Sequence, residues 1–380
     1  MQATQARGSD AHSADAKLFQ PTRIGCIDIA NRVVMAPLTR CRADEPAGDV
    51  PGSDINVEYY RQRSGAGLII SEGTQISPVG KGYMATPGIY SEAQVEGWRR
   101  ITDTVHAAGS KMLAQIWHVG RITHPALTGG AQPIAPSAIA PRDVVAYTHQ
   151  GKVDIPTPQA MSVQQIADVV AQFRQAAANA LRAGFDGVEI HGANGYLIDQ
   201  FLRDGANRRD DAYGGSVAAR CRLALEIVDA VAAEIGAARV GIRLSPLTPF
   251  NDLADSDPQR TFDHLVEQLD ARGIAFVHFI EGSTGGARDL PGFDYAKARK
   301  SFRGAYIANN GYDRAMAIEA VESGRADAVA FGRAFLANPD LVQRLRVGAP
   351  LNAPDAQTFY TPGAAGYTDY PTLDAQPAVA

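Results

Sequence analysis

The chain has 380 residues, of which 45% are apolar and 20% charged, and its formal net charge is −5. This composition suits a soluble globular enzyme with a large core, and the lack of any long Lys/Arg run argues against nucleic acid as a partner. No stretch approaches the roughly 20 consecutive apolar residues of a membrane span, so we expect no membrane association.

The two ends of the chain differ in character from its body. Residues 1–16 are polar, rich in Ala and Ser, and contain no apolar signal core, which predicts a disordered tail rather than a secretory peptide. We expect one domain over 17–373 and a short tail over 374–380. Three widely spaced cysteines form neither a disulfide framework nor a cluster-binding set, which favours a cytoplasmic protein.

Short β-rich runs recur along the body of the chain. Each carries branched or bulky apolar residues and is bounded by Gly, Pro or charged residues. Their near-continuous apolarity is typical of strands that are buried on both faces. The eight predicted strands are 32–36, 67–71, 112–117, 187–191, 240–244, 276–280, 306–308 and 328–331.

Helical patterns lie between these strands. In the clearest of them, Ser162 and Gln165 form a capping box and Gly184 marks the end. Alternating strands and helices predict a (β/α)8 TIM barrel; an open doubly wound sheet is less favoured because no Gly-x-Gly-x-x-Gly follows the first strand. The predicted helices are 163–181, 217–235, 258–272 and 313–323.

Two segments do not follow this alternation of strands and helices. Residues 120–158, rich in Pro, Gly, Thr and Ala, form an insertion after the third strand that is too long for a plain loop. It is either a lid or substrate wall over the active face, or a structural cap without a role in chemistry. The irregular segment from Gly348 onwards contains four aromatic residues, so we expect it to pack back onto the body.

Polar residues gather where the predicted strands end, which is where such barrels carry their active sites. His191, Asn194 and Tyr196 follow the fourth strand and offer two hydrogen-bonding side chains and one weak acid. This set can hold a carbonyl oxygen and supply a proton beside it. A metal site is not expected, because no second His or carboxylate lies at ligand spacing.

The last two strands end in Asn310-Gly311 and Gly332-Arg333. The loops after strands seven and eight are the recurrent phosphate site of such barrels, although glycines there can also serve only to turn a strand into a helix. Arg243 lies within the fifth strand and points either outward to a carboxylate or inward, where a buried cation needs an anionic partner. A reduced flavin would be such a partner.

The motifs of this chain resemble those of the Old Yellow Enzyme family of FMN-dependent ene-reductases, and the resemblance covers about residues 17–373. The residues that carry it are Ala36-Pro37-Leu38-Thr39-Arg40, Gln115-Ile116-Trp117-His118, His191 to Leu202, Asn207-Arg208-Arg209, Tyr213-Gly214-Gly215, Arg243-Leu-Ser-Pro246, Phe331-Gly332-Arg333 and Gly366 to Pro371.

This resemblance implies a set of site residues around one non-covalent FMN. The isoalloxazine ring would be surrounded by Pro37, Thr39, Gly73, Gln115 and Arg243, and the phosphate would be held by Asn310, Gly311, Gly332 and Arg333. Trp117, Tyr83, Phe250 and Tyr360 would form walls of the substrate pocket. One branch of the family has a cysteine where Thr39 stands; here the cysteine comes two residues later, which places the chain in the threonine-type branch.

The resemblance also implies the reaction. NADPH or NADH would reduce FMN, and hydride would then pass to the β-carbon of an α,β-unsaturated carbonyl, nitro or maleimide compound. His191 and Asn194 would bind the carbonyl oxygen, and Tyr196 would give a proton to the α-carbon. The partners would be small activated alkenes, and the protein a monomer or homodimer. Two alternatives stay open: another flavin barrel dehydrogenase, and a flavin-binding protein without turnover.

Overall fold

Eight parallel strands close into a barrel in the computed structural model, which describes residues 14–374. Because β6 pairs with β11 and β15 pairs with β3, the barrel has no open edge. Its strands are β3 (Val33–Met35), β4 (Leu68–Ile70), β6 (Lys111–Trp117), β11 (Gly187–Gly192), β12 (Val240–Leu244), β13 (Phe276–Ile280), β14 (Ala305–Asn309) and β15 (Ala328–Phe331). All eight predicted runs coincide with these strands, and the predicted barrel is confirmed.

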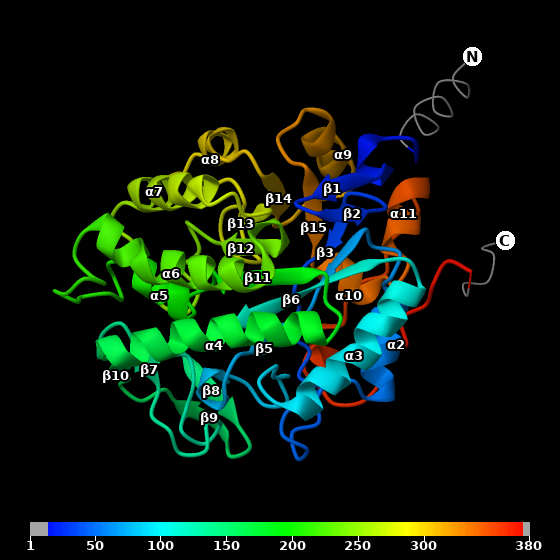
Figure 1. Cartoon of the computed structure of the whole chain (residues 1–380). Helices are drawn as coiled ribbons and strands as arrows, with labels where there is room; N and C mark the ends of the chain where they lie inside the picture. Colours follow the sequence, from blue (N-terminus) through cyan, green and yellow to red (C-terminus); the bar gives the residue numbers. More distant parts are fainter. Residues whose placement is uncertain (1–13, 375–380) are drawn as a thin grey trace.

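Helices surround the strands, as Figure 1 shows. In α4 the buried residues Ile166, Val169 and Phe173 recur three and four positions apart, so one face packs on the barrel. Ser162 and Gln165 form the predicted capping box. The helices are α2 (Asp54–Gln62), α3 (Glu92–Ala107), α4 (Val163–Arg182), α5 (Leu197–Leu202), α6 (Val217–Ile235), α7 (Pro258–Ala271), α8 (Tyr295–Ser301), α9 (Arg314–Glu322), α10 (Arg333–Ala337) and α11 (Leu341–Val347). No helix within 14–374 is long and apolar enough to cross a membrane.

A small hairpin closes one end of the barrel. Its strands β1 (Thr22–Ile24) and β2 (Ile27–Ile29) place Ile24, Ile27 and Ile29 in one apolar cluster with inward-facing barrel residues such as Leu68 and Phe276. This cluster fills the end from which the strands start, so the open end is the one where they finish. Of the two predicted tails, residues 1–13 and 375–380 lie outside the described residues, while Ala16 is buried.

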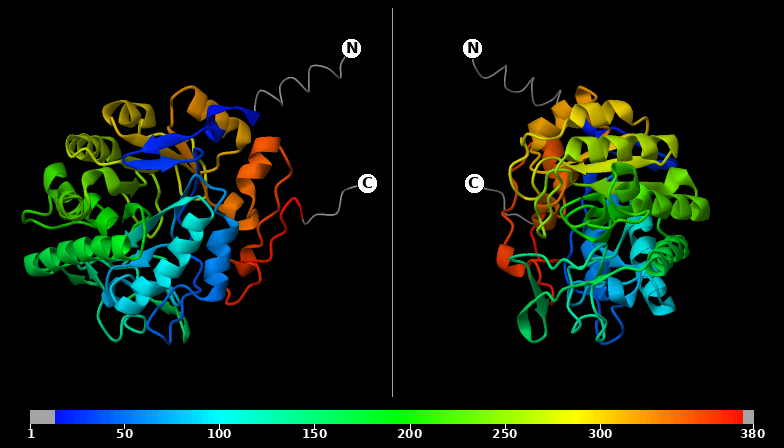
Figure 2. Two further views of the ribbon diagram at one scale, coloured as in Figure 1. Left: turned by 45° about the vertical axis from the view of Figure 1, so that its right-hand side comes forward. Right: turned by 90° about the vertical axis from the view of Figure 1, so that its left-hand side faces the viewer.

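The insertion after β6 has its own short strands. They are β7 (Ile134–Ala135), β8 (Val145–Thr148) and β9 (Gly151–Asp154), and β10 (Gln159–Ala160) follows. The β8–β9 hairpin lies on the same side of the barrel as the C-terminal segment drawn in red in Figure 2. The other short elements are β5 (Thr74–Gln75) and the 3-10 helices η1 (Lys17–Phe19), η2 (Pro78–Gly80), η3 (Ala237–Arg239) and η4 (Ala356–Thr358).

The segment after α11 packs back onto the barrel, as predicted. Two arginines that follow β3 hold it: Arg40 donates to the carbonyl oxygen of Gly366 at 2.7 Å, and Arg42 donates to that of Gly363 at 2.9 Å. Tyr367 is fully buried and its ring stacks on Tyr59, with centroids 4.1 Å apart. The beginning and the end of the barrel are therefore joined at one place.

Glu72, just after β4, lies beneath this contact and gives the fold a pH dependence. It is 4% exposed, it accepts a hydrogen bond from the backbone N–H of Arg40 at 3.1 Å, and burial raises its pKa to about 7. A carboxyl with a raised folded-state pKa contributes stability below its unfolded pKa, which is lost as the pH rises through 7.

We therefore expect the free energy of unfolding to fall by about 3 kcal/mol between pH 4.5 and 8 on account of this group. The variant Glu72→Gln should flatten the profile, as measured by denaturant unfolding at pH 5 and pH 8. Glu58→Gln is the matched control, because Arg61 lowers the pKa of that partly exposed carboxyl. An unchanged pH profile in Glu72→Gln would contradict the assignment.

Candidate active site

His191 lies at the end of β11 as a neutral hydrogen-bond donor. Its ring is 3% exposed, and burial, together with the charge of Arg243, holds its pKa well below the ordinary value. The backbone N–H of Ala193 donates to Nδ1 at 3.3 Å, so the proton of the neutral ring is on Nε2. The ring therefore presents a fixed Nε2–H donor.

Asn194 stands beside it in a strained backbone conformation. Its φ is 59°, a left-handed value that asparagine tolerates better than most residues. The N–H of Asn194 donates to Ser245 Oγ at 2.9 Å, and its carbonyl accepts from Asn251 Nδ2 at 2.8 Å. Thr284 Oγ1 donates to Asn194 Oδ1 at 2.6 Å. Since Oδ1 is engaged, the side chain offers its Nδ2–H groups as donors.

Tyr196 is the N-cap residue of α5 and completes the group. The side chain is 6% exposed, and its hydroxyl lies 2.9 Å from the hydroxyl of Tyr83. Burial, assisted by Tyr83, raises the pKa of Tyr196 well above its ordinary value. The phenol therefore keeps its proton throughout the neutral pH range and can act as an acid toward a strong carbon base.

Trp117, at the end of β6, packs against the rings of His191, Tyr83 and Tyr196. Its indole is parallel to the His191 ring at 5.9 Å and to the Tyr83 ring at 6.0 Å, and it meets Tyr196 edge-on at 4.9 Å. A Cβ on Gly73 would come within 2.7 Å of this indole, so only glycine fits there. The glycine predicted to face a flavin has a packing role as well.

Arg243 lies inside the barrel on β12, next to His191 in register. It is 7% exposed, its Nη2 donates to Asn309 Oδ1 at 2.8 Å, and its Nε has no partner within residues 14–374. Burial lowers its pKa to about 10, so it is still a cation at neutral pH. A buried cation with an unused N–H is suited to a bound group that carries or gains negative charge.

The predicted phosphate residues come together at the ends of β14 and β15. A Cβ on Gly311 would meet no atom within 4 Å, so the backbone there borders open space. Arg333 is exposed, and its guanidinium lies beside Gly285 of the loop after β13. The Asn310 side chain, by contrast, donates to the carbonyls of Glu281 and Ser283, at 2.7 and 2.9 Å, and is used to hold that loop.

The other predicted residues lie around this group at different depths. Pro37 and Thr39 are half-buried after β3. Phe250 and Tyr360 are 46% and 65% exposed, so they stand at a rim rather than in an enclosed wall. Burial raises the pKa of Tyr83 to about 12, and Tyr360 and Tyr147 of the insertion lie close enough to add to this effect.

Two buried residues of the barrel interior were not recognised as site residues from the sequence. Glu189 lies on β11 and His278 on β13, and neither is assigned a role from the sequence. Both are fully buried, with Glu189 Oε2 2.6 Å from His278 Nδ1, and Gln115 Nε2 donates to Glu189 Oε1 at 2.8 Å. A polar residue between two apolar neighbours of a buried strand was the signal in each case.

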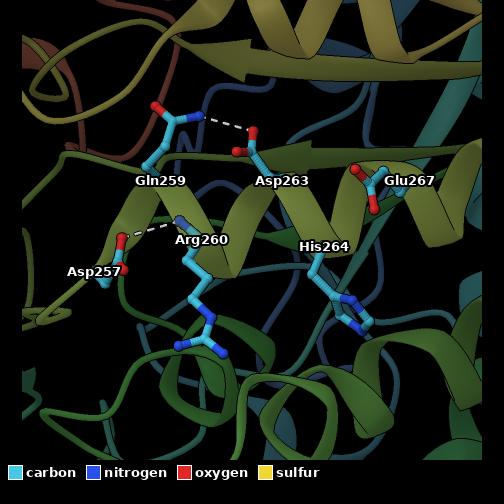
Figure 3. A pocket seen from close by; sticks show the side chains of 6 residues that line it. All are labelled: Asp257, Gln259, Arg260, Asp263, His264 and Glu267. Atoms are coloured by element: carbon cyan, nitrogen blue, oxygen red, sulfur yellow. Dashed lines mark hydrogen bonds between the residues drawn. The ribbon is translucent and has the colours of Figure 1, made fainter.

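A surface hollow of about 430 Å³ lies on the outer face of α7 (Figure 3). Its residues satisfy one another along the helix, since Gln259 donates to Asp263 at 2.7 Å and Asp257 caps the N–H of Arg260 at 3.0 Å. This pattern is typical of a solvent-exposed helix face. The candidate site lies instead at the strand ends.

Comparison with known proteins places this geometry among flavin enzymes. Residues 17–352 match a family model described as the NADH:flavin oxidoreductase / NADH oxidase family. The chain is 44% identical to 12-oxophytodienoate reductase 1 of Oryza sativa subsp. japonica over 96% of its own length and 95% of the relative's. It is 46% identical to a probable flavin mononucleotide-dependent alkene reductase of Leishmania infantum, over 94% and 97%.

Solved structures give the same result. Morphinone reductase is 45% identical with a TM-score of 0.88, over 94% of this chain and 97% of that one. An Old Yellow Enzyme homologue from Zymomonas mobilis is 43% identical with a TM-score of 0.90, over 94% and 100%. Morphinone reductase has also been solved in complex with tetrahydroNAD.

Proposed function

This chain belongs to the NADH:flavin oxidoreductase / NADH oxidase family and is of the Old Yellow Enzyme type, and from that premise we propose that it is an FMN-dependent ene-reductase driven by NADPH or NADH. The observation that carries the proposal is the grouping of one neutral histidine donor, one amide donor and one protonated tyrosine at a single strand end. The substrates would be small alkenes activated by a carbonyl, nitro or imide group.

The residues present fit FMN. Arg243 and Gln115 would face the pyrimidine end of the ring, with Thr39, Pro37 and Gly73 around it. The phosphate would lie at Gly311, Gly332, Arg333 and the backbone of Asn310. The unused Nε of Arg243 and the open space at Gly311 support this placement. When bound, FMN supplies a hydride that it has first received from the nicotinamide.

His191 and Asn194 would bind the activating oxygen of the substrate. Each offers an N–H that the protein orients through its other atoms: Ala193 fixes the tautomer of His191, and Thr284 engages the oxygen of the Asn194 amide. Negative charge grows on the substrate oxygen as hydride reaches the β-carbon. Donors that are already aimed there stabilise that charge without reorganisation.

Tyr196 would protonate the α-carbon. Its raised pKa keeps the proton available, and the nearby hydroxyl of Tyr83, which is less buried, can return a proton after each turnover. Other flavin barrel dehydrogenases would need a Cys or Ser base or an iron–sulfur cluster. Here Cys26 is exposed, and burial raises the pKa of Cys41 and Cys221 to about 12, so neither thiol is ionised at neutral pH and available as a base.

The insertion would form one wall of the substrate pocket. Its Arg121 donates to the carbonyls of Asn251 and Asp252, which ties it to the loop that holds Asn194. A cytoplasmic location and a monomeric or homodimeric state are further proposals from the sequence.

The proposed function predicts a yellow protein. Anaerobic NADPH or NADH should bleach the absorption of bound FMN, and 2-cyclohexenone should then restore it. Protein that stays colourless after incubation with FMN would contradict the proposal. Bleaching without recovery on any activated alkene would instead indicate a flavin-binding protein without turnover.

Thr284 provides a separate test of the oxygen-binding pair. Thr284→Val removes the hydroxyl that engages Asn194 Oδ1, so the amide can turn and present its oxygen to the ligand. We expect phenols, whose phenolate oxygen requires donors, to bind about tenfold more weakly, as for the loss of one hydrogen bond. The measurement is a titration of the FMN-bound protein with a phenol, followed through the broad long-wavelength absorption band that a phenolate gives when it stacks on FMN. Thr284→Ser keeps the hydroxyl and should restore affinity; equal weakening in both variants would contradict the role.

A further inference from the structure

A polar network lies inside the barrel next to the residues assigned to FMN. Glu189 and His278 are both 0% exposed, on β11 and β13. The carboxylate is bonded through both oxygens, to Gln115 Nε2 at 2.8 Å and to His278 Nδ1 at 2.6 Å. Buried polar residues of this kind are costly unless they are fully paired, so the pairing calls for a functional explanation.

The direction of each hydrogen bond follows from the chemistry of the carboxylate, which only accepts. His278 therefore carries its proton on Nδ1, and its Nε2 has no partner within residues 14–374. Burial lowers the pKa of His278, in agreement with a neutral ring. The charges of this region thus come from Glu189 and from Arg243, whose pKa the Glu189 carboxylate raises against the effect of burial.

The same reasoning fixes the amide of Gln115. Because Nε2 is turned toward Glu189, the carbonyl oxygen Oε1 is the atom that this side chain can offer to a ligand. An oxygen there accepts from an imide N–H, such as that of the pyrimidine ring of a flavin. With the amide turned the other way, two N–H groups would face that imide N–H.

We propose that Glu189, supported by His278, is a positioning residue with two separable effects. Its hydrogen bond orients Gln115 so that the pocket accepts an imide N–H, and its negative charge opposes that of the reduced cofactor and lowers the reduction potential. The inference rests on the FMN site proposed above. It adds Glu189 and His278 to that site, and neither residue would touch the cofactor itself.

Two variants separate the two effects. Glu189→Gln keeps the shape and both hydrogen bonds, since its carbonyl accepts from Gln115 and its amide N–H donates to His278 after a change of tautomer, but it removes the charge. Glu189→Asp keeps the charge but shortens the side chain by one methylene group, so the carboxylate lies farther from Gln115. A residue that only supports packing would not divide the effects in this way.

The readouts are the midpoint potential of bound FMN, measured against a reference dye, and the dissociation constant of FMN. Glu189→Gln should shift the oxidised–reduced equilibrium at least tenfold toward the reduced form, about +30 mV for two electrons, with FMN affinity within threefold of wild type. Glu189→Asp should weaken FMN binding about tenfold and move the equilibrium by less than threefold. Glu226→Gln, on α6 outside the barrel, is the matched charge control and should change neither.

An unshifted potential in Glu189→Gln, or parallel changes in the two variants, would overturn the inference. Should Glu189→Gln fail to fold, Glu189→Asp decides alone, because unchanged FMN affinity there contradicts the positioning of Gln115. If the wild-type protein binds FMN and is reduced by NADPH, but neither variant changes the midpoint potential or the FMN affinity, only this inference is refuted. Wild-type protein without FMN refutes the proposed function itself.

Discussion

Replacing Tyr196 with Phe is expected to slow the reduction of 2-cyclohexenone by the reduced enzyme by about 10²- to 10⁴-fold, while NADPH reduces the bound FMN at the wild-type rate. The reason is that the phenol is the acid of the second half-reaction only. Its buried hydroxyl, with a pKa well above 10, keeps its proton until a carbanion-like carbon lies next to it. Stopped-flow absorbance of bound FMN measures the two half-reactions separately.

Tyr213→Phe is the matched control for this variant. Its hydroxyl also donates a hydrogen bond, to Glu226 at 3.0 Å, but it lies against α6 outside the barrel. It should leave both half-reactions within twofold of wild type. Equal loss in the two half-reactions of Tyr196→Phe would show that the tyrosine shapes the pocket rather than donating a proton.

The second large effect is expected from His191→Phe. An aromatic ring retains the stacking on Trp117, but the Nε2–H donor is lost. One oxyanion donor contributes roughly 10²- to 10³-fold to the rate, so the alkene half-reaction should fall by that amount and phenols should no longer bind tightly. His191→Asn offers an N–H again and should recover part of the loss.

The pH dependence adds a check on this role. Because burial holds the pKa of His191 well below 6.5, the ring is already neutral across pH 6–8, and the alkene half-reaction should show no titration from it. His264→Phe, at a half-buried residue on the outer face of α7, is the matched control and should be close to wild type. A rate that rises with protonation of a group near pH 6.5 would argue for an imidazolium instead.

The barrel was predictable because its strands are buried on both faces. Near-continuous apolar runs, four of them followed by a predicted helix, leave few other architectures. The hairpin of Thr22–Ile24 and Ile27–Ile29 was not predicted, since alternation over three residues carries too little signal. The strands of the insertion have only two to four residues each, and their pattern is equally weak.

The site was predictable to the extent that it lies at strand ends. His191, Asn194 and Tyr196 are close in sequence, so their proximity needed no knowledge of the fold. The contact between Tyr83 and Tyr196 spans 113 residues, and that between Glu189 and His278 spans 89. Such pairs are brought together by barrel closure, and no local spacing indicates them.

The two arginines that follow the first barrel strand bind carbonyls more than 300 residues away in sequence. On a ribosome they would be synthesised long before those carbonyls exist. A nascent chain would therefore carry two guanidinium groups that cannot yet be desolvated, and contacts of this span are slow to form. We infer that the rim beside Tyr360 is assembled late in folding, so the pocket would gain its final shape only after the rest of the barrel has closed.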